Sequence, residues 1–390
     1  MDSQHQAGDA VGESAADAST TGAPEPAIRL VGVTKTFPGS DTPAVGDLSL
    51  DMAHGELTAL VGPSGCGKST TLKMINRLLE PTAGEIYVQG TEVRAQPKHE
   101  LRRRIGYVIQ QIGLFPHRTI AHNIATVPRL LGWSKARIRD RTAELAEQVG
   151  LAPELLDRYP SALSGGQQQR VGVARALAAD PPVLLMDEPY SAVDPIVRKQ
   201  LQDDLLSLQR DLHKTIVLVT HDIDEAIKLA DRIVLLNVGG VLEQVGSPAE
   251  VLRSPANEFV ETFLGRERGL KRMALITVGQ VSLTPGPVLS TDAPANAAAA
   301  VMAEAGTEWV GVLDGEQMVG WAWGRDLARA TLVGDAPREP FRAYVRPGNS
   351  IREALDNIVN SRTRVAVVLS EDGDRYLGML TVDELAEALE

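Results

Sequence analysis

The sequence Leu-Ser-Gly-Gly-Gln at residues 163–167 constrains the fold of this chain more than any other feature, because it predicts a helix start built to meet an anion. The first N–H groups of a helix are unpaired and the macrodipole is positive there, so helix N-termini attract phosphate. The two glycines let the backbone come close to such a group. A second helix start of this kind is predicted at Lys68. One phosphate-bearing ligand rarely needs both, so the pair indicates two chains that share two ligands.

A complete phosphate-binding loop surrounds that second helix start. The sequence GPSGCGKST at residues 62–70 fits the pattern G-x-x-x-x-G-K-[ST]. A predicted buried strand at 57–61 leads into the loop, and a predicted helix from Ser69 to Leu79 follows it. We expect Lys68 to reach the β and γ oxygens of a nucleotide and Ser69 to hold Mg²⁺. The predicted contacts in the loop are Gly62, Pro63, Ser64, Gly65, Cys66, Gly67, Lys68, Ser69 and Thr70.

Two acidic residues, Asp187 and Glu188, follow the apolar run Val183–Met186. Four apolar residues in a row predict a strand buried on both faces, as in parallel sheets. At the end of such a strand Asp187 can bind Mg²⁺, directly or through water. Glu188 is placed to polarise an attacking water. An isolated pair of acids fits a helix cap equally well, but the two phosphate motifs favour the catalytic interpretation.

Together these motifs resemble those of the ATP-binding cassette (ABC) ATPases, over roughly residues 28 to 264. The resemblance implies that Gln110 contacts ATP and Mg²⁺ and faces the membrane partner. It also implies that His221 contacts the γ-phosphate and acts with Glu188 in hydrolysis. Phe37 falls where the family stacks an aromatic ring on adenine, although a tyrosine is usual there and a packing role is the alternative. The residues expected to contact ATP on the opposite subunit are Ser164, Gly165, Gly166, Gln167 and Asp194, and the expected Mg²⁺ ligands are Ser69, Gln110 and Asp187.

The order of predicted elements indicates an α/β fold. Strands alternate with helices, which predicts a parallel sheet covered on both faces. The resemblance sets an ABC domain at residues 28–268, with a helical subdomain at about 112–178 that carries Ser164. Residues 1–27 hold five acidic residues and no Lys or Arg, so we expect a disordered acidic tail.

Charge and cysteine content exclude some classes of protein. The net charge of −12 argues against nucleic acid as a partner, because phosphate backbones are met by an excess of Lys and Arg. The single cysteine, Cys66, permits no disulfide within the chain, which suits a reducing cytoplasm. No run of about 18 apolar residues is present, so the sequence predicts no membrane-spanning helix.

An internal repeat follows residue 270. Gly320 corresponds to Gly378 and Leu327 to Leu385, each with an offset of 58 residues (378 − 320 and 385 − 327). The pattern resembles a tandem pair of cystathionine-β-synthase (CBS) domains, each an α+β unit, at 269–332 and 333–390. CBS domains that bind adenosine ligands use a hydroxyl residue and an acid three positions on, which the second copy has as Thr381 and Glu384. The first copy has Trp323 in place of the hydroxyl residue, so a purely structural role in dimerisation stays open.

One ABC cassette followed by two CBS domains resembles the ATPase subunit of osmoprotectant importers, which take up glycine betaine, carnitine, choline or proline. The resemblance implies a homodimer on the cytoplasmic face of the membrane, bound peripherally to integral-membrane permease subunits. It also implies an extracellular solute-binding protein, ATP and Mg²⁺ as cofactors, and a possible regulatory nucleotide at the CBS pair. The alternatives are an importer ATPase for another small solute such as an amino acid, a soluble ABC ATPase without transport, and a CBS nucleotide sensor.

Overall fold

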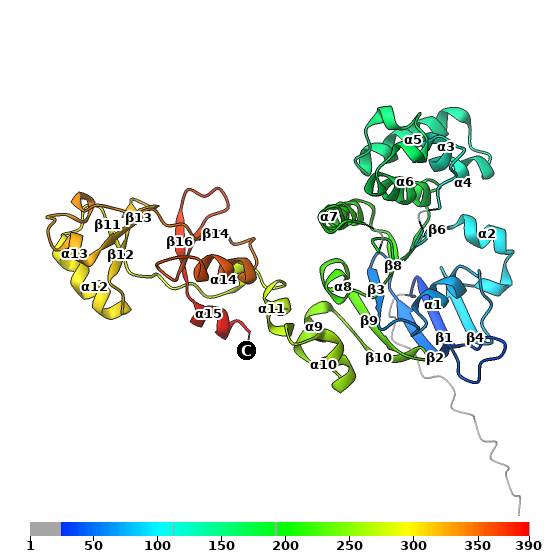
Figure 1. The fold of residues 1–390 in the computed structure, drawn as a ribbon, viewed down its shortest axis with the longest axis horizontal. Coiled ribbons are helices and arrows are strands. Elements are labelled where there is room, and N and C mark those ends of the chain that lie inside the picture. The colour runs from blue at the N-terminus through cyan, green and yellow to red at the C-terminus, as the bar shows by residue number, and fades with distance from the viewer. Residues whose placement is uncertain (1–24, 112, 192, 390) are drawn as a thin grey trace, which may run out of the picture.

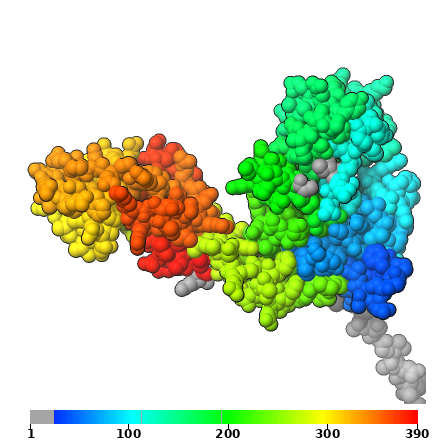
Figure 2. Space-filling model, viewed as in Figure 1, coloured from blue at the N-terminus to red at the C-terminus, as the bar shows by residue number. Residues whose placement is uncertain are grey.

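The computed structural model describes residues 25–389 except 112 and 192, and it forms two bodies (Figure 1). The cassette body runs from residue 25 to the end of α10 (Glu258–Leu264), and the C-terminal body begins with the short helix α11 (Arg268–Met273). Figure 2 shows the narrow junction between the two bodies. Of the predicted acidic tail, residues 1–24 lie outside the described residues. Pro26 and Ala27 are buried, and Gln89 donates its backbone N–H to the Ala27 carbonyl over 2.8 Å.

The cassette is built on two sheets. The first is antiparallel, with the order β2-β1-β4-β5. The second has the order β10-β9-β3-β8-β7-β6 and is parallel except for β10. The strands are β1 (Ile28–Lys35), β2 (Val45–Met52), β3 (Leu57–Val61), β4 (Ala83–Val88), β5 (Thr91–Glu92), β6 (Ile105–Val108), β7 (Val183–Asp187), β8 (Thr215–Thr220), β9 (Arg232–Asn237) and β10 (Val241–Gly246).

Helices surround the second sheet, and a separate helical lobe stands above it in Figure 1. The helices beside the sheets are α1 (Lys68–Ile75), α2 (Lys98–Arg103), α7 (Pro195–Leu212), α8 (Ile223–Leu229), α9 (Pro248–Arg253) and α10 (Glu258–Leu264), with the 3₁₀ turn η1 (Val93–Ala95). The lobe holds α3 (Ile120–Ile124), α4 (Thr126–Leu130), α5 (Lys135–Gln148) and α6 (Gly165–Leu177), with the 3₁₀ turns η2 (Pro153–Leu155) and η3 (Pro160–Ala162).

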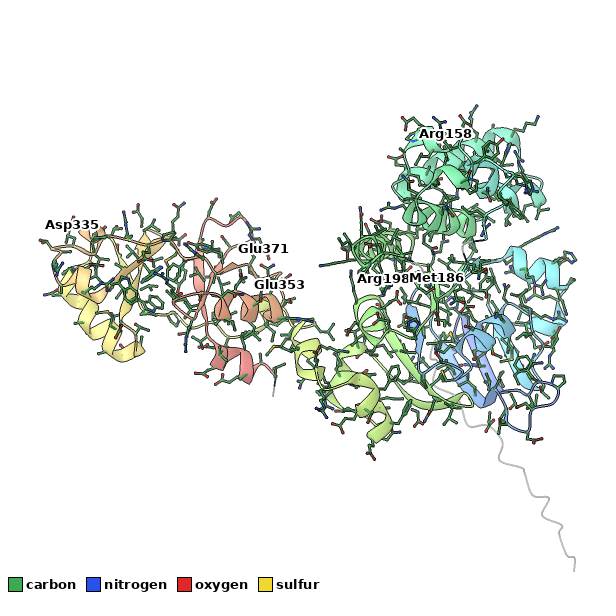
Figure 3. All side chains as sticks on the ribbon, in the orientation of Figure 1. Arg158, Met186, Arg198, Asp335, Glu353 and Glu371 are labelled. Carbon is green, nitrogen blue, oxygen red and sulfur yellow. The ribbon has the colours of Figure 1, made fainter. Side chains whose placement is uncertain are left out.

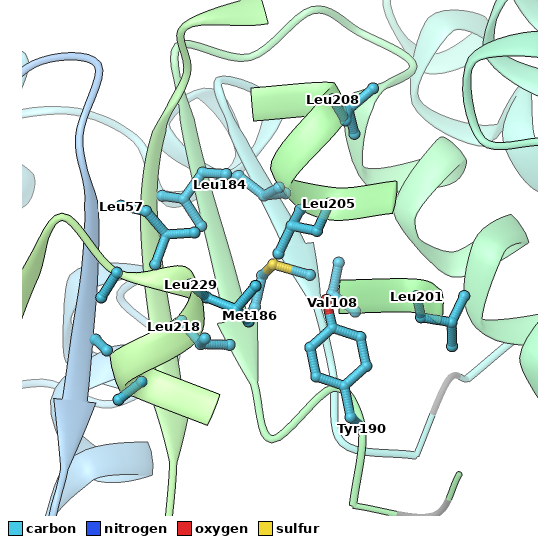
Figure 4. Packing of buried hydrophobic residues seen from close by; sticks show 14 of the residues in the cluster. Leu57, Val108, Leu184, Met186, Tyr190, Leu201, Leu205, Leu208, Leu218 and Leu229 are labelled. Carbon is cyan, nitrogen blue, oxygen red and sulfur yellow. The ribbon is translucent and has the colours of Figure 1, made fainter. Parts of the chain in front are cut away.

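Every residue of β3, β7 and β8 is buried, because both faces of the parallel sheet are covered. Alternate residues of β7 enter opposite cores, as the period of a strand requires. Leu184 and Met186 pack with α7 (Figure 4), whereas Val183 and Leu185 pack with the α1 side. Figure 3 shows Met186 deep in the cassette among the surrounding side chains. The sheet therefore holds the carboxyl ends of its strands in fixed places, and the site is built there.

The C-terminal body consists of two similar units, each with a three-stranded sheet. Their strand orders are β11-β12-β13 and β14-β15-β16, and each pairs one parallel and one antiparallel neighbour. The elements are α11 (Arg268–Met273), η4 (Val278–Gln280), β11 (Val288–Ser290), η5 (Ala295–Ala297), α12 (Ala298–Ala305), β12 (Trp309–Asp314), β13 (Gln317–Trp323), α13 (Gly324–Leu327), η6 (Val333–Asp335), β14 (Tyr344–Val345), α14 (Ile351–Val359), β15 (Ala366–Leu369), β16 (Tyr376–Leu380) and α15 (Val382–Glu387).

The two units exchange their leading segments. Val278, which precedes the first sheet, packs in the core of the second unit, and Val333 packs in the core of the first. The glycines at the 58-residue offset permit this exchange. A Cβ at Gly320 would lie 2.7 Å from the Glu339 carbonyl oxygen, and one at Gly378 would lie 2.9 Å from the Thr284 carbonyl oxygen. The predicted boundary between residues 332 and 333 separates the two copies of the sequence repeat. Side-chain packing crosses this boundary in both directions, because each copy contributes a residue to the core of the other unit.

Candidate nucleotide-binding and hydrolysis site

The phosphate loop joins the end of β3 to α1, and Gly67 is the N-cap of α1. Two of its glycines are required by close backbone contacts. Gly62 has a φ of 156°, and a Cβ there would lie 2.0 Å from the Leu236 carbonyl oxygen. Gly67 has a φ of 95°, and a Cβ there would lie 2.4 Å from the Ala44 carbonyl oxygen. The loop is thus fixed against β9 and against the residue that precedes β2, while its N–H groups remain at the start of a helix.

The ammonium group of Lys68 curls over this loop. Its Nζ donates to the carbonyl oxygens of Gly62 and Pro63 over 2.8 and 2.9 Å, and the residue is only 6% exposed. Cys66 is fully buried beneath it, with Sγ 3.6 Å from Nζ. The loop therefore presents a positive charge at the place where the sequence predicts phosphate oxygens.

The carboxylate of Asp187, at the end of β7, is held on both oxygens. The Ser69 hydroxyl donates to Oδ1 over 2.7 Å, and the Tyr107 hydroxyl donates to Oδ2 over 3.5 Å. Burial and the negative charge of Asp187 raise the pKa of Tyr107, so the phenol keeps its proton. Hydroxyl and carboxylate oxygens are ligands that Mg²⁺ accepts, so Ser69 and Asp187 fit the predicted metal role. Sequence reasoning had not placed Tyr107 at this site.

A second carboxylate, that of Glu188, lies between two other predicted residues. Gln110 donates its Nε2 to Glu188 Oε2 over 3.2 Å, and His221 Nδ1 lies 3.4 Å from the same oxygen. Glu188 has a φ of 43°, in the left-handed region that is unusual for a side chain of this size. Its backbone N–H donates to the Val219 carbonyl over 3.0 Å, which fixes the turn against β8. The structure thus brings Gln110, Glu188 and His221 together.

The Leu-Ser-Gly-Gly-Gln segment begins α6, as the sequence predicts. Ser164 is the N-cap and forms a capping box with Gln167, whose backbone N–H donates to Ser164 Oγ over 3.3 Å while its side chain accepts from the Ser164 N–H over 2.9 Å. Gly165 faces open space. Asp194 is exposed and caps α7, where its Oδ1 accepts from the Ile196 N–H over 2.9 Å. The first turn of α6 is therefore rigid and open to a ligand from outside the chain.

Gly166 serves packing between the helical lobe and the core. It is buried, and a Cβ there would lie 2.5 Å from Val197 Cγ1 on α7. We expect Gly166→Ala to lower the free energy of unfolding by about 1–3 kcal/mol through overpacking. The double variant with Val197→Ala should recover most of this loss, and urea unfolding of the three proteins checks it. Equal stability of Gly166→Ala and the native chain would contradict the contact.

The remaining predicted residues are placed as follows. Phe37 is 39% exposed in the turn after β1, with Lys35 Nζ 5.4 Å from its ring centroid, and its stacking on adenine stays a prediction. Thr381 and Glu384 bond to each other as the capping box of α15. This box gives both side chains a structural use, and their role as a CBS ligand site stays a prediction.

A buried carboxyl group, Glu225, was not predicted. It is 6% exposed on α8, accepts from the Thr220 hydroxyl directly before His221, and lies 3.5 Å from the Gln202 side-chain nitrogen on α7. Burial, the largest cause, raises the pKa of Glu225. An acid in the first turn of a helix is ordinary, so the sequence carried no signal for this contact.

Glu225→Gln fills the same space, with its amide oxygen placed to accept from Gln202 and its amide N–H placed to donate to the Thr220 hydroxyl, and it is expected to change the pH dependence of stability. Because the folded-state pKa of Glu225 is raised above its ordinary value of 4.5, this group stabilises the fold fully below that value. Its contribution is lost as the pH rises through the raised pKa. The variant should therefore show a flatter curve of free energy of unfolding against pH. Denaturant titrations from acid to neutral pH measure this, and superimposable curves would refute it.

The fold and the site define a P-loop ATPase of the cassette class. A family model described as ABC transporter matches residues 45–191, and one described as CBS domain matches residues 333–390. The osmoprotectant import ATP-binding protein OsmV of Salmonella typhimurium is 45% identical, over 93% of this chain and 96% of its own length. The glycine betaine/carnitine/choline transport ATP-binding protein OpuCA of Bacillus subtilis is also 45% identical, over 92% of this chain and 95% of its own length.

Solved structures agree with this class. A dimeric bacterial ABC transporter cassette is 36% identical over 57% of this chain and 98% of its own, with a TM-score of 0.52. A dimeric cassette in a post-hydrolysis state bound to ADP and Pi is 35% identical over 57% of this chain and 98% of its own, with a TM-score of 0.51. The chain belongs to the ABC transporter family, among the ATP-binding subunits of osmoprotectant importers that carry CBS domains. It is an ATP-hydrolysing transport ATPase. In the described part of the chain, no helix combines the length and apolar character that a membrane span needs.

Proposed function

We propose that this chain powers the import of glycine betaine, carnitine, choline or proline through a permease, with the CBS pair as regulatory gate. The proposal rests chiefly on the similarity to OpuCA and OsmV, which extends over more than nine tenths of the chain and includes the C-terminal body. The partners are a second copy of the chain, two integral-membrane permease subunits and an extracellular solute-binding protein. The chain works peripherally on the cytoplasmic face of the membrane.

ATP binds at the start of α1 in this proposal. Lys68 leaves the carbonyl oxygens of Gly62 and Pro63 and moves to the β and γ oxygens, where its charge is neutralised more strongly. Ser69, Asp187 and Gln110 would hold Mg²⁺, which neutralises the phosphate charge when it is bound. The Tyr107 hydroxyl keeps the Asp187 carboxylate in place when Ser69 turns away from it.

Hydrolysis requires two chains. The open first turn of α6, with Ser164 and Gly165, meets the γ-phosphate bound to the other chain, and Asp194 lies in the loop that crosses between them. Glu188 polarises the attacking water, and His221 holds the γ-phosphate in line. The 3.4 Å separation of the Glu188 carboxylate and the His221 ring supports this division of labour. Positioning and charge stabilisation supply most of the catalysis.

Closure and reopening of the dimer are passed to the permease through the helical lobe. Gln110 contacts Glu188, and the loop that follows Gln110 continues into α3. Asn123 fixes this loop, because it accepts from the Phe115 N–H over 2.7 Å and donates to its carbonyl. Exposed apolar side chains in this region favour a protein partner. They are Phe115, Leu130, Leu131 and Tyr159.

Reconstitution with the permease encoded beside this chain tests the proposal. We expect glycine betaine with its binding protein to stimulate ATP hydrolysis, and hydrolysis to begin above a threshold of ionic strength. Stimulation by an amino acid instead would replace the cargo and keep the transport role. Basal hydrolysis that no solute and no salt concentration changes would reject the osmoprotectant proposal.

A further inference from the structure

The short loop that carries His221 joins the end of β8 to the start of α8. The side chain of His221 is 58% exposed, and its Nδ1 lies 3.4 Å from Glu188 Oε2. An exposed side chain can adopt several rotamers, and a loose backbone would add further freedom. A fixed position for the ring beside Glu188 therefore requires that the backbone on both sides of His221 is fixed.

Both neighbours of His221 are bonded to one hydroxyl group. Thr220, the last residue of β8, is 2% exposed, and its Oγ1 accepts from the Asp222 N–H over 3.0 Å. The same hydroxyl donates to Glu225 Oε2. A hydroxyl can accept and donate at once, so Thr220 ties the residue before His221 to the residue after it, and Glu225 sets the direction of that hydroxyl.

These contacts close into a ring of hydrogen bonds that includes Glu225. Asp222 Oδ1 accepts from the Glu225 backbone N–H over 3.4 Å, while the Glu225 carboxyl group holds the Thr220 hydroxyl that Asp222 bonds. The second carboxyl oxygen, Oε1, lies 3.5 Å from the Gln202 side-chain nitrogen on α7. Glu225 is only 6% exposed, so its side chain is enclosed and partnered from two elements.

Glu188, the neighbour of the His221 ring, is anchored to the same strand. Its backbone N–H donates to the Val219 carbonyl over 3.0 Å, one residue before Thr220. The strands that precede the two residues are also paired, with Asp187 opposite Val219. The separation between the Glu188 carboxylate and the His221 ring is therefore set at the end of β8. A backbone hydrogen bond fixes one side, and the ring of contacts through Thr220 and Glu225 fixes the other.

Stability alone does not account for an acid at this position. Burying a carboxyl group costs free energy that an apolar side chain of similar size would not. Burial, the largest cause, raises the pKa of Glu225, and acids perturbed in this way concentrate at functional sites. The acid supplies a hydrogen-bond acceptor at a fixed point for the hydroxyl beside His221.

We propose that Glu225 is a positioning residue for ATP hydrolysis, which acts through Thr220 to fix the backbone on both sides of His221 and so holds the imidazole ring beside Glu188. The inference rests on the proposed function, because the role of His221 at the γ-phosphate is taken from there. Small displacements of a catalytic group cost rate, whereas the phosphate loop around Lys68 is left intact. Loss of Glu225 should therefore slow hydrolysis and leave ATP binding unchanged.

Steady-state phosphate release by the full chain, with ATP and Mg²⁺, tests the inference. Glu225→Ala should lower kcat at least about tenfold and change KM for ATP less than about threefold. Thr220→Val removes the hydroxyl from the other end of the same bond and should give the same result. Glu225→Gln and Thr220→Ser each keep a hydrogen bond and should hydrolyse ATP within about threefold of the native rate. A native kcat in Glu225→Ala or in Thr220→Val would overturn the proposal, and so would an equal loss in Glu225→Gln and Glu225→Ala.

The loss of a buried hydroxyl elsewhere in the cassette controls for damage to the fold. Thr142 on α5 is 6% exposed, and its hydroxyl donates to the Ile138 carbonyl over 2.7 Å. Thr142→Val is the matched control for Thr220→Val and should hydrolyse ATP at the native rate. Urea unfolding shows that each variant is folded under the assay conditions. If Thr142→Val lowers kcat as much as Thr220→Val does, the effect is one of general stability and the proposal fails.

A double-mutant cycle shows whether Glu225 acts through His221. The double variant of His221→Ala and Glu225→Ala should be no slower than His221→Ala alone, because the ring that Glu225 positions is already absent. A further loss of about tenfold in the double variant would overturn the inference and keep the role of His221. A slow His221→Ala beside a native Glu225→Ala would reject the inference alone. Native hydrolysis by His221→Ala would reject the role of His221 in the proposed function, and the inference with it.

Discussion

Glu188→Gln is expected to bind ATP normally and to hydrolyse it at least about 100-fold more slowly than the native chain. The Glu188 carboxylate lies 3.2 Å from the Gln110 amide and 3.4 Å from His221, where the attacking water is expected. A glutamine fills the same space but is a poor proton acceptor, so the water is no longer polarised. The ATP-bound dimer should accumulate, because it forms and does not turn over. Phosphate release measures the rate, and gel filtration with ATP and Mg²⁺ measures the dimer.

This substitution separates catalysis from folding unusually well. Glutamine and glutamate pay the same conformational cost at the φ of 43°, and the backbone bond to Val219 does not depend on the side chain. Glu258→Gln, at an acid in the first turn of α10, is the matched control and should hydrolyse ATP at the native rate. Near-normal turnover of Glu188→Gln would remove Glu188 from the reaction and leave Asp187 as the acid to test next.

The parallel strands of the cassette could be predicted because their sequence signal is local. The largely apolar segments at 57–61, 183–187 and 215–220 coincide with β3, β7 and β8, since these strands are buried on both faces. The edge strand β10 was not predicted. Its residues are exposed or half-buried without clear alternation, so neither a buried run nor a period of two marks it.

The candidate site likewise contains residues whose positions the sequence could predict and residues whose positions it could not. The phosphate loop and the start of α6 are local motifs, and a helix begins after each as the sequence predicts, although α1 ends at Ile75 and not at the predicted Leu79. The approach of His221 to Glu188 joins residues that directly follow two different strands, β8 and β7, and only the family resemblance anticipated it. Contacts with no motif, such as those of Tyr107 and Glu225, were missed because they depend on how distant elements pack.

The C-terminal body shows a further limit. A hydroxyl residue three positions before an acid is a signature of a helix cap as well as of a ligand site, and Thr381 and Glu384 form the cap. The exchange of Val278 and Val333 between the units could not be read from the 58-residue repeat, because a repeat in the sequence does not say which copy a leading segment joins.

Lys68→Ala and Ser164→Arg are expected to fail at different steps. Lys68→Ala removes the only cation in the phosphate loop and should weaken ATP binding by at least about 100-fold. Ser164→Arg should bind ATP as a monomer with native affinity, because the hydrogen bonds of Ser164 stay within the first turn of α6. It should not form the ATP-bound dimer. Equilibrium binding of ATP and gel filtration of each variant with ATP and Mg²⁺ separate the two steps.

Loss of the N-cap alone must be excluded for Ser164→Arg, because a lost cap costs about 1 kcal/mol. Ser134→Arg is the matched control. Ser134 caps α5 in the same way, through a 3.3 Å bond from the Arg137 N–H to its hydroxyl, and it lies outside the predicted site. This control should keep both dimerisation and hydrolysis. If it loses them to the same extent, the effect of Ser164→Arg is one of helix stability.

A mixture of the two variants gives the sharpest test of two chains that share two nucleotides. In a mixed dimer one site carries both substitutions, whereas the other combines the native Lys68 of one chain with the native Ser164 of the other. Mixing two inactive proteins should therefore restore part of the hydrolysis, with a maximum near equal amounts. If each chain instead completed its own site, every site in the mixture would carry one substitution and no activity would return. Equal loss of ATP binding by both variants would also reject the shared site.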